Sequence, residues 1–212
     1  MTNIISENIN ESEDEIFIYP TDTVWGIGCS IYSERGFLKI VTIKKTTKDK
    51  PLSIMFYGID EVAKYFQFPN RVTMEWLNDF FKLETTLALP LKSSRIKIPK
   101  WVNGSSSFVS LRCLESDVIK KIYKKVNGPF FTTSLNITGL EPITDQQAAL
   151  DFQKKYAPAA LIVTNTDAAL TPQLSGSAST IVFFNENFQF EIKREGKRSE
   201  EVKAHLKKLF NI

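Results

Sequence analysis

The strongest constraint on the fold is the way short β-rich runs and amphipathic helical runs follow one another along almost the whole chain. Residues 16–19 and 24–31 are β-rich, and a helix is expected from the capping residue Ser33 to about residue 45. Further strands are expected at 52–56, 86–91, 108–112, 130–133, 161–164, 180–184 and 188–193, and further helices at 60–66, 71–82, 116–126, 144–156 and 199–210. Thr144 and Ser199 are expected to cap the last two helices. The order is not a strict strand–helix alternation, and there is no internal repeat or low-complexity linker. The pattern therefore predicts a single α/β domain with a mixed sheet.

Length and charge agree with one ordinary globular domain. The chain has 212 residues, of which 42% are hydrophobic and 24% charged. A net charge of +3 gives a mildly basic surface, compatible with anionic ligands but without the dense basic stripe of a duplex-DNA binder. The start lacks the features of a signal peptide, and no apolar run approaches the ~18 residues of a membrane span. We therefore expect a cytoplasmic protein with no membrane association.

The scarcity of histidine and cysteine excludes several enzyme classes. Cys29 and Cys113 lie in apolar, strand-like surroundings without CxxC spacing, which predicts buried free thiols rather than a zinc site or a disulfide. The single histidine, His205, lies beside the apolar face of the last helix, where we expect a structural role. Serine–histidine and cysteine–histidine nucleophilic systems and HExxH zinc sites are therefore excluded. The sequence also contains no P-loop and no dinucleotide-binding fingerprint.

Loops rich in Thr, Ser, Asn and Lys follow several of the expected strands. They lie at residues 21–23, 44–50, 132–136 and 175–180. Hydroxyl, amide and ammonium groups of this kind suit the binding of phosphates and of a zwitterion. The polar stretch 92–107 has no periodicity and is expected to be a mobile or ligand-covering loop.

Six ordered motifs give the sequence a family resemblance. They are Tyr19-Pro20-Thr21-Asp22-Thr23-Val24-Trp25-Gly26, Ile43-Lys44 with Asp49-Lys50-Pro51-Leu52-Ser53, Ser110-Leu111-Arg112, Thr133-Ser134-Leu135-Asn136-Ile137-Thr138-Gly139, Ser179-Thr180-Ile181-Val182 and Arg194-Glu195-Gly196. In this order the chain resembles the YrdC-like family, the threonylcarbamoyl-AMP synthases, in its short single-domain form. The resemblance implies a polar lead at 1–15, a YrdC-like domain at 16–196 and a C-terminal helix at 197–212 packed on the same domain. It also implies a twisted mixed sheet flanked by helices, with a concave basic ligand-binding face.

The resemblance implies a nucleotidyltransferase reaction. L-Threonine, bicarbonate and ATP would give threonylcarbamoyl-AMP and pyrophosphate, for the threonylcarbamoyladenosine modification of tRNA. The amine of threonine would capture carbon dioxide, and the resulting carboxylate would attack the α-phosphate of ATP. Such a step needs positioning and charge stabilisation more than a side-chain nucleophile or base, so a site without histidine is expected.

The resemblance also assigns residues to each substrate. Threonine would be held by Thr23, Arg112, Thr132 and Ser179, with the Arg112 guanidinium pairing with its carboxylate. ATP would be held by Lys44 and Lys50 at the phosphates, by Ser134 and Asn136, and by Arg194 near its far end. Mg²⁺ would bridge the phosphates with few protein ligands, so no protein metal site is expected. Asp22 is expected to stabilise its turn rather than to bind the metal.

One departure from the family pattern keeps two alternatives open. Thr46 stands where the family usually has an arginine, which removes a charge-assisted donor from the basic loop. One alternative is a YrdC-like RNA-binding module without synthase activity, with Lys92, Arg95, Lys97 and Lys100 on its basic face. The other is a paralogue that adenylates a different carbamate. Transfer RNA or double-stranded RNA and a downstream threonylcarbamoyl transferase are the candidate macromolecular partners.

Overall fold

The structure is a computed structural model that describes residues 14–165, 173–185, 187 and 189–209. Most of the expected polar lead and Phe210, the last apolar residue of the expected C-terminal helix, lie outside the described residues. None of the helices in the described ranges is both long enough and apolar enough to cross a membrane.

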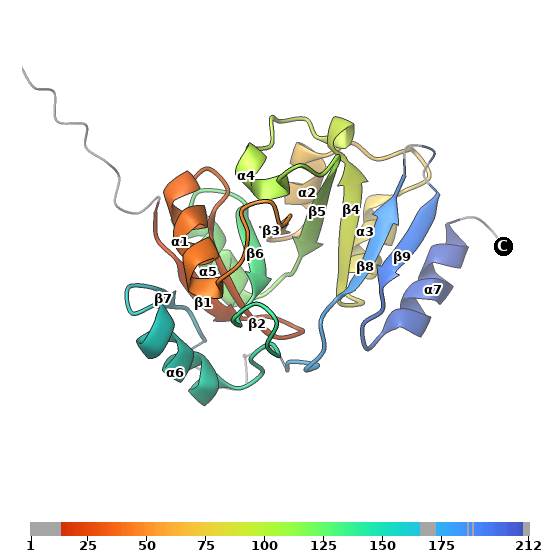
Figure 1. Ribbon diagram of the computed structural model, residues 1–212. Helices are drawn as coiled ribbons and strands as arrows, with labels where there is room; N and C mark the ends of the chain where they lie inside the picture. The colour runs from red at the N-terminus through yellow and green to blue at the C-terminus, as the bar shows by residue number, and fades with distance from the viewer. Residues whose placement is uncertain (1–13, 166–172, 186, 188, 210–212) are drawn as a thin grey trace, which may run out of the picture.

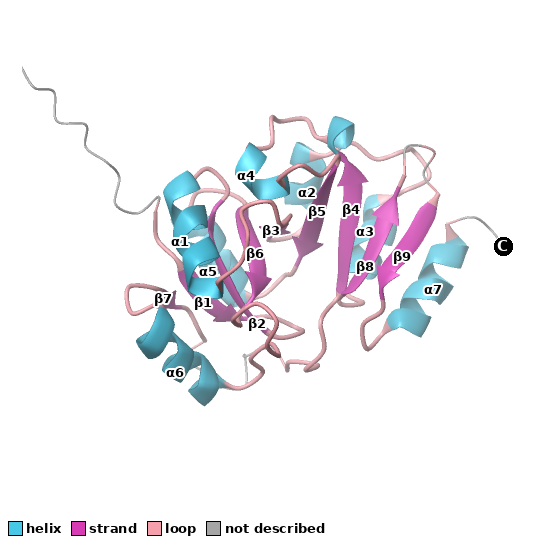
Figure 2. Ribbon diagram, viewed as in Figure 1, coloured by secondary structure: helices cyan, strands magenta, loops and turns pink. Residues whose placement is uncertain are grey.

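One mixed sheet runs through the molecule, with helices around it (Figure 2). Its strands in the described residues are β1 (Phe17–Pro20), β2 (Trp25–Ser30), β3 (Ser53–Phe56), β4 (Thr85–Pro90), β5 (Phe108–Cys113), β6 (Phe130–Ser134), β7 (Leu161–Ile162), β8 (Thr180–Phe184) and β9 (Phe190–Arg194). They are ordered β7-β1-β2-β6-β3-β5-β4-β8-β9. The pairs β1–β7, β3–β5 and β4–β8 are parallel and the others antiparallel. The predicted α/β fold with a mixed sheet is confirmed.

The helices begin close to the residues that the sequence indicates, except for the short helix at Lys100–Asn103, where a loop was expected. They are α1 (Glu34–Lys44), α2 (Ile59–Tyr65), α3 (Met74–Phe81), α4 (Lys100–Asn103), α5 (Asp117–Lys125), α6 (Gln146–Tyr156) and α7 (Ser199–Lys208), with a short 3-10 turn at Leu91–Ser93. Ser33 caps α1, as expected, by accepting the Gly36 N–H at 2.9 Å. The predicted cap of α6 is wrong, because Asp145 accepts the first free N–H of that helix. The predicted cap of α7 is also wrong, because Ser199 is already helical.

Both faces of the sheet carry buried side chains, because alternate residues of a strand point to opposite faces. Ile18 and Phe131 belong to the main core, together with apolar residues of α1, α2, α3, α6 and α7. Their neighbours Tyr19 and Phe130 point the other way and pack against α5 through residues such as Ile119. The strand register shows that this second face is apolar under α5 and carries small and polar residues further across the sheet.

A row of small and polar residues crosses the second face. Gly28, Thr132, Ser53, Ser110 and Ala88 are directly paired neighbours on β2, β6, β3, β5 and β4. Paired residues of adjacent strands point to the same side. The face that is apolar under α5 therefore continues as a polar floor across the middle of the sheet.

The terminal helix α7 lies at the opposite end of the molecule from α6 (Figure 1). The ring of His205 stacks on Trp76 of α3 with centroids 4.7 Å apart, and one ring nitrogen lies 3.0 Å from the Trp76 carbonyl oxygen. Val202 and Leu206 join the main core. The expected structural role of His205 is confirmed.

Residues 92–107, expected to form a mobile or ligand-covering loop, pack on the domain. Trp101 of α4 donates its indole N–H to the Ile31 carbonyl at 3.0 Å. Val102 is fully buried, and its carbonyl accepts the Leu52 N–H at 2.9 Å. Two apolar side chains in a polar stretch thus anchor it, although they are too few to produce a periodic pattern.

The two cysteines are buried free thiols, as predicted. Burial raises the pKa of Cys113 to about 12 and raises that of Cys29 further. Both side chains are therefore thiols and not thiolates at neutral pH.

Candidate functional site

A cavity of about 320 Å³ lies on the polar part of the second sheet face. Its wall includes residues of β2, β3, β4, β5, β6, β8 and β9 and of the β1–β2 turn. The polar side chains of the wall are Thr21, Thr23, Lys50, Ser53, Thr86, Ser110, Arg112, Thr132, Thr133, Ser134, Ser179 and Arg194. Hydroxyl groups and cations dominate this set, and it contains no carboxylate.

The turn between β1 and β2 places Thr23 in the wall. The Thr21 hydroxyl donates to the Val24 carbonyl at 2.6 Å and accepts the Thr23 N–H at 3.1 Å. The carbonyls of Asp22 and Thr23 accept N–H groups of residues 175–176, both at 2.9 Å. The Thr21 hydroxyl and the loop at residues 175–176 thus hold this turn in place. The Asp22 carboxylate takes no part in these bonds.

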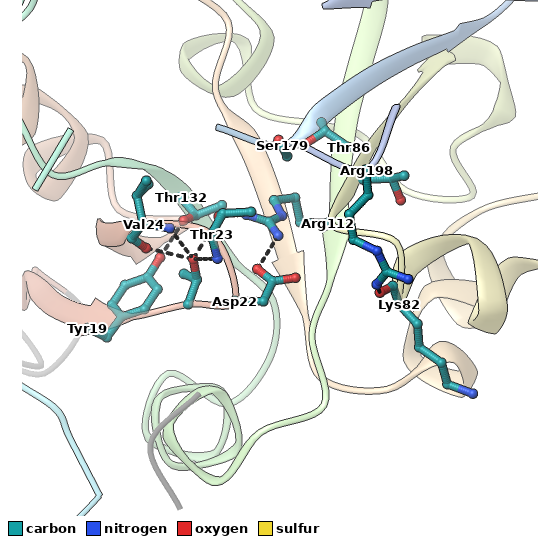
Figure 3. Close-up of polar contacts among 12 residues, drawn as sticks. Tyr19, Asp22, Thr23, Val24, Lys82, Thr86, Arg112, Thr132, Ser179 and Arg198 are labelled. Carbon is teal, nitrogen blue, oxygen red and sulfur yellow. Dashed lines mark hydrogen bonds and ion pairs between the residues drawn. The ribbon is translucent and has the colours of Figure 1, made fainter. Parts of the chain in front are cut away.

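Arg112 extends from β5 to this turn and is only 8% exposed (Figure 3). Its Nη1 donates to the Thr23 hydroxyl at 2.9 Å, and its Nη2 donates to Asp22 Oδ1 at 2.5 Å. Asp22 was expected to stabilise its own turn, but its carboxylate instead forms an ion pair with Arg112. The Arg112 Nε–H is buried and has no partner among the described residues. A buried donor without an acceptor is costly in a folded protein, so this N–H is available to a ligand.

A buried tyrosine sets the position of Thr132. The Tyr19 hydroxyl donates to Thr132 Oγ1 at 2.5 Å, and burial raises the pKa of the phenol. A Cβ atom at Gly26 would lie 2.9 Å from the Tyr19 ring. Glycine at this position therefore lets the tyrosine ring lie across β2 and reach β6.

Ser179 and Arg194 form the far wall of the cavity. The Ser179 hydroxyl is hydrogen-bonded to the Thr86 hydroxyl at 2.8 Å and accepts Arg194 Nη2 at 3.2 Å. Arg194 Nε also donates to the Ser179 carbonyl at 3.0 Å. Burial and the charge of Arg112 lower the pKa of Arg194. Two guanidinium groups that act on each other in this way create a positive potential that favours an anion.

Lys44 lies behind the wall rather than in it. Its ammonium group is buried and donates to Asn136 Oδ1 at 2.8 Å, to the Asn136 carbonyl at 3.0 Å and to the Ser134 carbonyl. The Ser134 hydroxyl donates to the same Asn136 Oδ1 at 2.8 Å. Burial and the nearby Lys50 lower the pKa of Lys44 to about 7. Lys44 and Asn136 therefore shape the loop that carries Ser134, whereas Lys50 lines the cavity itself.

The residues present do not form a magnesium site of their own. The described part of the chain contains no group of three or more His, Cys, Asp or Glu residues that could hold a metal ion. Asp22, which lies next to the cavity, is paired with Arg112. A magnesium ion that arrives with a nucleotide would be held by phosphate oxygens and water.

The structure brings most of the expected site residues together. The cavity wall includes all the residues expected to hold threonine, together with Lys50, Ser134 and Arg194, but not Lys44 or Asn136. The sequence analysis gave no site role to Thr86, nor to Tyr19, Ser53 and Ser110, although the last three lie in the quoted motifs. Ser110 follows from a signal that was available: Ser110 and Arg112 are alternate residues of one buried strand, so both point to the same face.

Comparison with known sequences identifies the family. Residues 11–196 match the Sua5/YciO/YrdC family, which is described as "Telomere recombination". A threonylcarbamoyl-AMP synthase of Aliivibrio fischeri is 27% identical over 155 residues, which are 68% of this chain and 82% of the relative. A threonylcarbamoyl-AMP synthase of Xanthomonas campestris pv. campestris is 27% identical over 143 residues, 64% of this chain and 72% of the relative.

Solved structures share the fold. Pyrococcus abyssi Sua5 in complex with L-threonine matches with a TM-score of 0.71 and 21% identity, over 90% of this chain and 54% of that protein. The chain thus spans about half the length of that Sua5 protein. Escherichia coli YciO matches with a TM-score of 0.68 and 18% identity, over 86% of this chain and 84% of that protein. With the family match covering most of its length, the chain belongs to the Sua5/YciO/YrdC family.

Proposed function

We propose that this protein synthesises L-threonylcarbamoyl-AMP and pyrophosphate from L-threonine, bicarbonate and ATP. The observation that carries the proposal is the buried Arg112 guanidinium, whose Nε–H has no partner in the described part of the chain. It lies among hydroxyl groups in a cavity that also contains Lys50 and Arg194. The threonylcarbamoyl-AMP synthases to which the sequence is similar support the same reaction.

The amino-acid end of the cavity suits a small hydroxylated zwitterion. Arg112 offers planar donors for a carboxylate. The hydroxyls of Thr23, Thr132 and Ser179 can both donate and accept, which suits a ligand that carries an amine and a hydroxyl group. Because these hydroxyls are held by Tyr19 and other fixed partners, the site is preorganised for one small ligand.

The chemistry needs no side-chain nucleophile. Bicarbonate takes up a proton and loses water, by cleavage of one C–O bond, to give carbon dioxide. The threonine nitrogen then forms a bond to this carbon and loses a proton, which gives a carbamate. A carbamate oxygen then attacks the α-phosphorus of ATP, and the bond to the leaving pyrophosphate breaks. Lys50, Ser134 and Arg194 would bind the nucleotide and its negative charge, and Lys44 would hold the loop that carries Ser134. Mg²⁺ would travel with the triphosphate, because the residues that the structure describes contain no group of three or more His, Cys, Asp or Glu that could hold it.

The product is a reactive mixed anhydride and implies an acceptor. A downstream threonylcarbamoyl transferase that modifies tRNA would consume it, and direct contact with tRNA or double-stranded RNA is part of the proposal. Lys92, Arg95, Lys97 and Lys100 have exposed side chains and are the candidates for such a contact.

The test is pyrophosphate release by the purified protein with ATP and Mg²⁺, with threonine and bicarbonate each present or omitted. Release that requires both is the expected result. Release with neither would mean a different adenylation or simple hydrolysis. No release under any condition, together with RNA binding that weakens steeply with salt, would favour an RNA-binding module without synthase activity.

A further inference from the structure

The carboxylate-binding group of the cavity already holds a carboxylate of the protein itself. Arg112 Nη2 donates to Asp22 Oδ1 at 2.5 Å, and the two side chains are 9% and 19% exposed. A guanidinium binds both oxygens of a carboxylate along one of two edges, and Nη2 belongs to each of them. Nη2 carries two N–H groups, so Asp22 takes one of them and places its negative charge beside both edges.

The remaining contacts of Arg112 would allow a ligand carboxylate to take the place of Asp22. Nη1 is held by the Thr23 hydroxyl at 2.9 Å, so the guanidinium plane stays fixed without Asp22. Nε is buried and has no partner among the described residues. The edge formed by Nε and Nη2 therefore has a free Nε–H directly beside the carboxylate of Asp22.

The charge of Arg112 explains both why Asp22 pairs with it in the empty cavity and why a ligand carboxylate competes with Asp22. A buried guanidinium without a counter-ion destabilises a protein strongly, so Asp22 neutralises Arg112 in the empty cavity. Two carboxylates on one guanidinium repel each other, so a ligand carboxylate and Asp22 compete.

The Asp22 side chain can move without disturbing its turn. The turn is fixed through backbone groups and the Thr21 hydroxyl, none of which involves the Asp22 carboxylate. Another cation near Asp22 is Arg198, immediately before α7, which donates to the Lys82 carbonyl (Figure 3) and to Glu201. The pKa of Arg198 is raised mainly by its hydrogen bond to Glu201, with a smaller contribution from the charge of Asp22.

We propose that Asp22 stands in for the substrate carboxylate: it occupies Arg112 while the cavity is empty and is displaced when the carboxylate of L-threonine binds. Asp22 is then a specificity residue, because only a ligand with its own carboxylate compensates for the broken ion pair. The identity of the ligand rests on the proposed function, whereas the displacement itself can be tested with any small carboxylate.

The first test is the affinity of Asp22→Asn for L-threonine, measured by calorimetry. Asparagine keeps the shape and an acceptor oxygen but removes the competing charge, so we expect the dissociation constant to fall roughly five- to tenfold. L-Threoninamide, which lacks the carboxylate, should show no such gain. Asp151→Asn, which removes one negative charge from the exposed side of α6, is the matched control and should leave the affinity unchanged. Unchanged or weaker threonine binding by Asp22→Asn would overturn the proposal.

The second test does not depend on threonine. The Arg112 Nε–H resonance, assigned by its loss in Arg112→Lys, is followed by NMR while acetate is added. We expect it to shift at a lower acetate concentration in Asp22→Asn than in the wild type, and equal titration curves would overturn the proposal. Failure of the wild type to bind threonine would count against the proposed function alone, because acetate still decides the displacement. If Asp22→Asn does not fold, the carboxyl carbon resonance of Asp22 in the wild type must shift at saturating ligand, and an unmoved resonance would contradict the exchange.

Discussion

Replacing Arg112 by lysine separates the charge of this residue from its planar geometry. In Arg112→Lys the ammonium group can still neutralise Asp22, so the fold should survive. It cannot present two parallel N–H groups to a carboxylate. The variant therefore loses one charge-assisted hydrogen bond to threonine, worth about 1.5–3 kcal/mol. At 1.4 kcal/mol for each factor of ten, the threonine KM should rise roughly 10- to 150-fold.

The assay is steady-state pyrophosphate release with threonine varied at saturating ATP and bicarbonate. The KM for ATP should stay close to the wild-type value, because Arg112 is assigned to the amino acid. Arg35→Lys is the matched control, since Arg35 is an exposed arginine whose ion pair with Asp14 lies outside the cavity wall. A wild-type threonine KM in Arg112→Lys would refute the assignment of the carboxylate to this guanidinium.

Three further substitutions test other parts of the account. Lys50→Ala should raise the KM for ATP roughly tenfold or more by removing a charge-assisted contact to phosphate, with the threonine KM unchanged; an identical ATP titration would show that Lys50 is solvated. Gly26→Ala places a methyl group 2.9 Å from the Tyr19 ring, so urea unfolding should report a loss of about 1–3 kcal/mol, and a wild-type midpoint would contradict the packing argument. Lys44 has its pKa lowered from 10.5 to about 7, so between these pH values the unfolded chain binds more protons than the native one. The unfolding free energy of the wild type should therefore rise with pH relative to Lys44→Met, and a constant difference would argue against a lowered pKa of the buried Lys44.

The fold was predictable where local rules agree with the tertiary structure. Ser33 caps α1 as expected, and Ser116 caps α5 at the residue where that helix was expected to begin, because a serine hydroxyl can satisfy the first free N–H groups of a helix. The strands were predictable because most are short runs of apolar and β-branched residues buried on both faces. The cap of α6 was not, since Thr144 and Asp145 are adjacent and both can cap a helix. The start of α7 was not either, because its N-cap is Arg198, which makes no side-chain capping bond.

The sequence predicted most of the residues of the site, but it did not predict which side chains contact one another. Motif resemblance named Thr132 and Lys44, yet the partner of Thr132 is Tyr19, 113 residues away, and the acceptors of Lys44 lie 90 and 92 residues away. Such contacts depend on the order of the strands, which no local pattern encodes. Asp22 shows the same limit: its position in a turn suggested a local bond, whereas the strand order brings Arg112 within reach.

The most direct measurement is mass spectrometry of the nucleotide products after incubation with ATP, L-threonine and ¹³C-bicarbonate. The account predicts threonylcarbamoyl-AMP that carries the ¹³C label, formed by the wild type and strongly reduced in Arg112→Lys at low threonine. AMP or ADP without a labelled threonine adduct, from a protein that binds ATP, would contradict it.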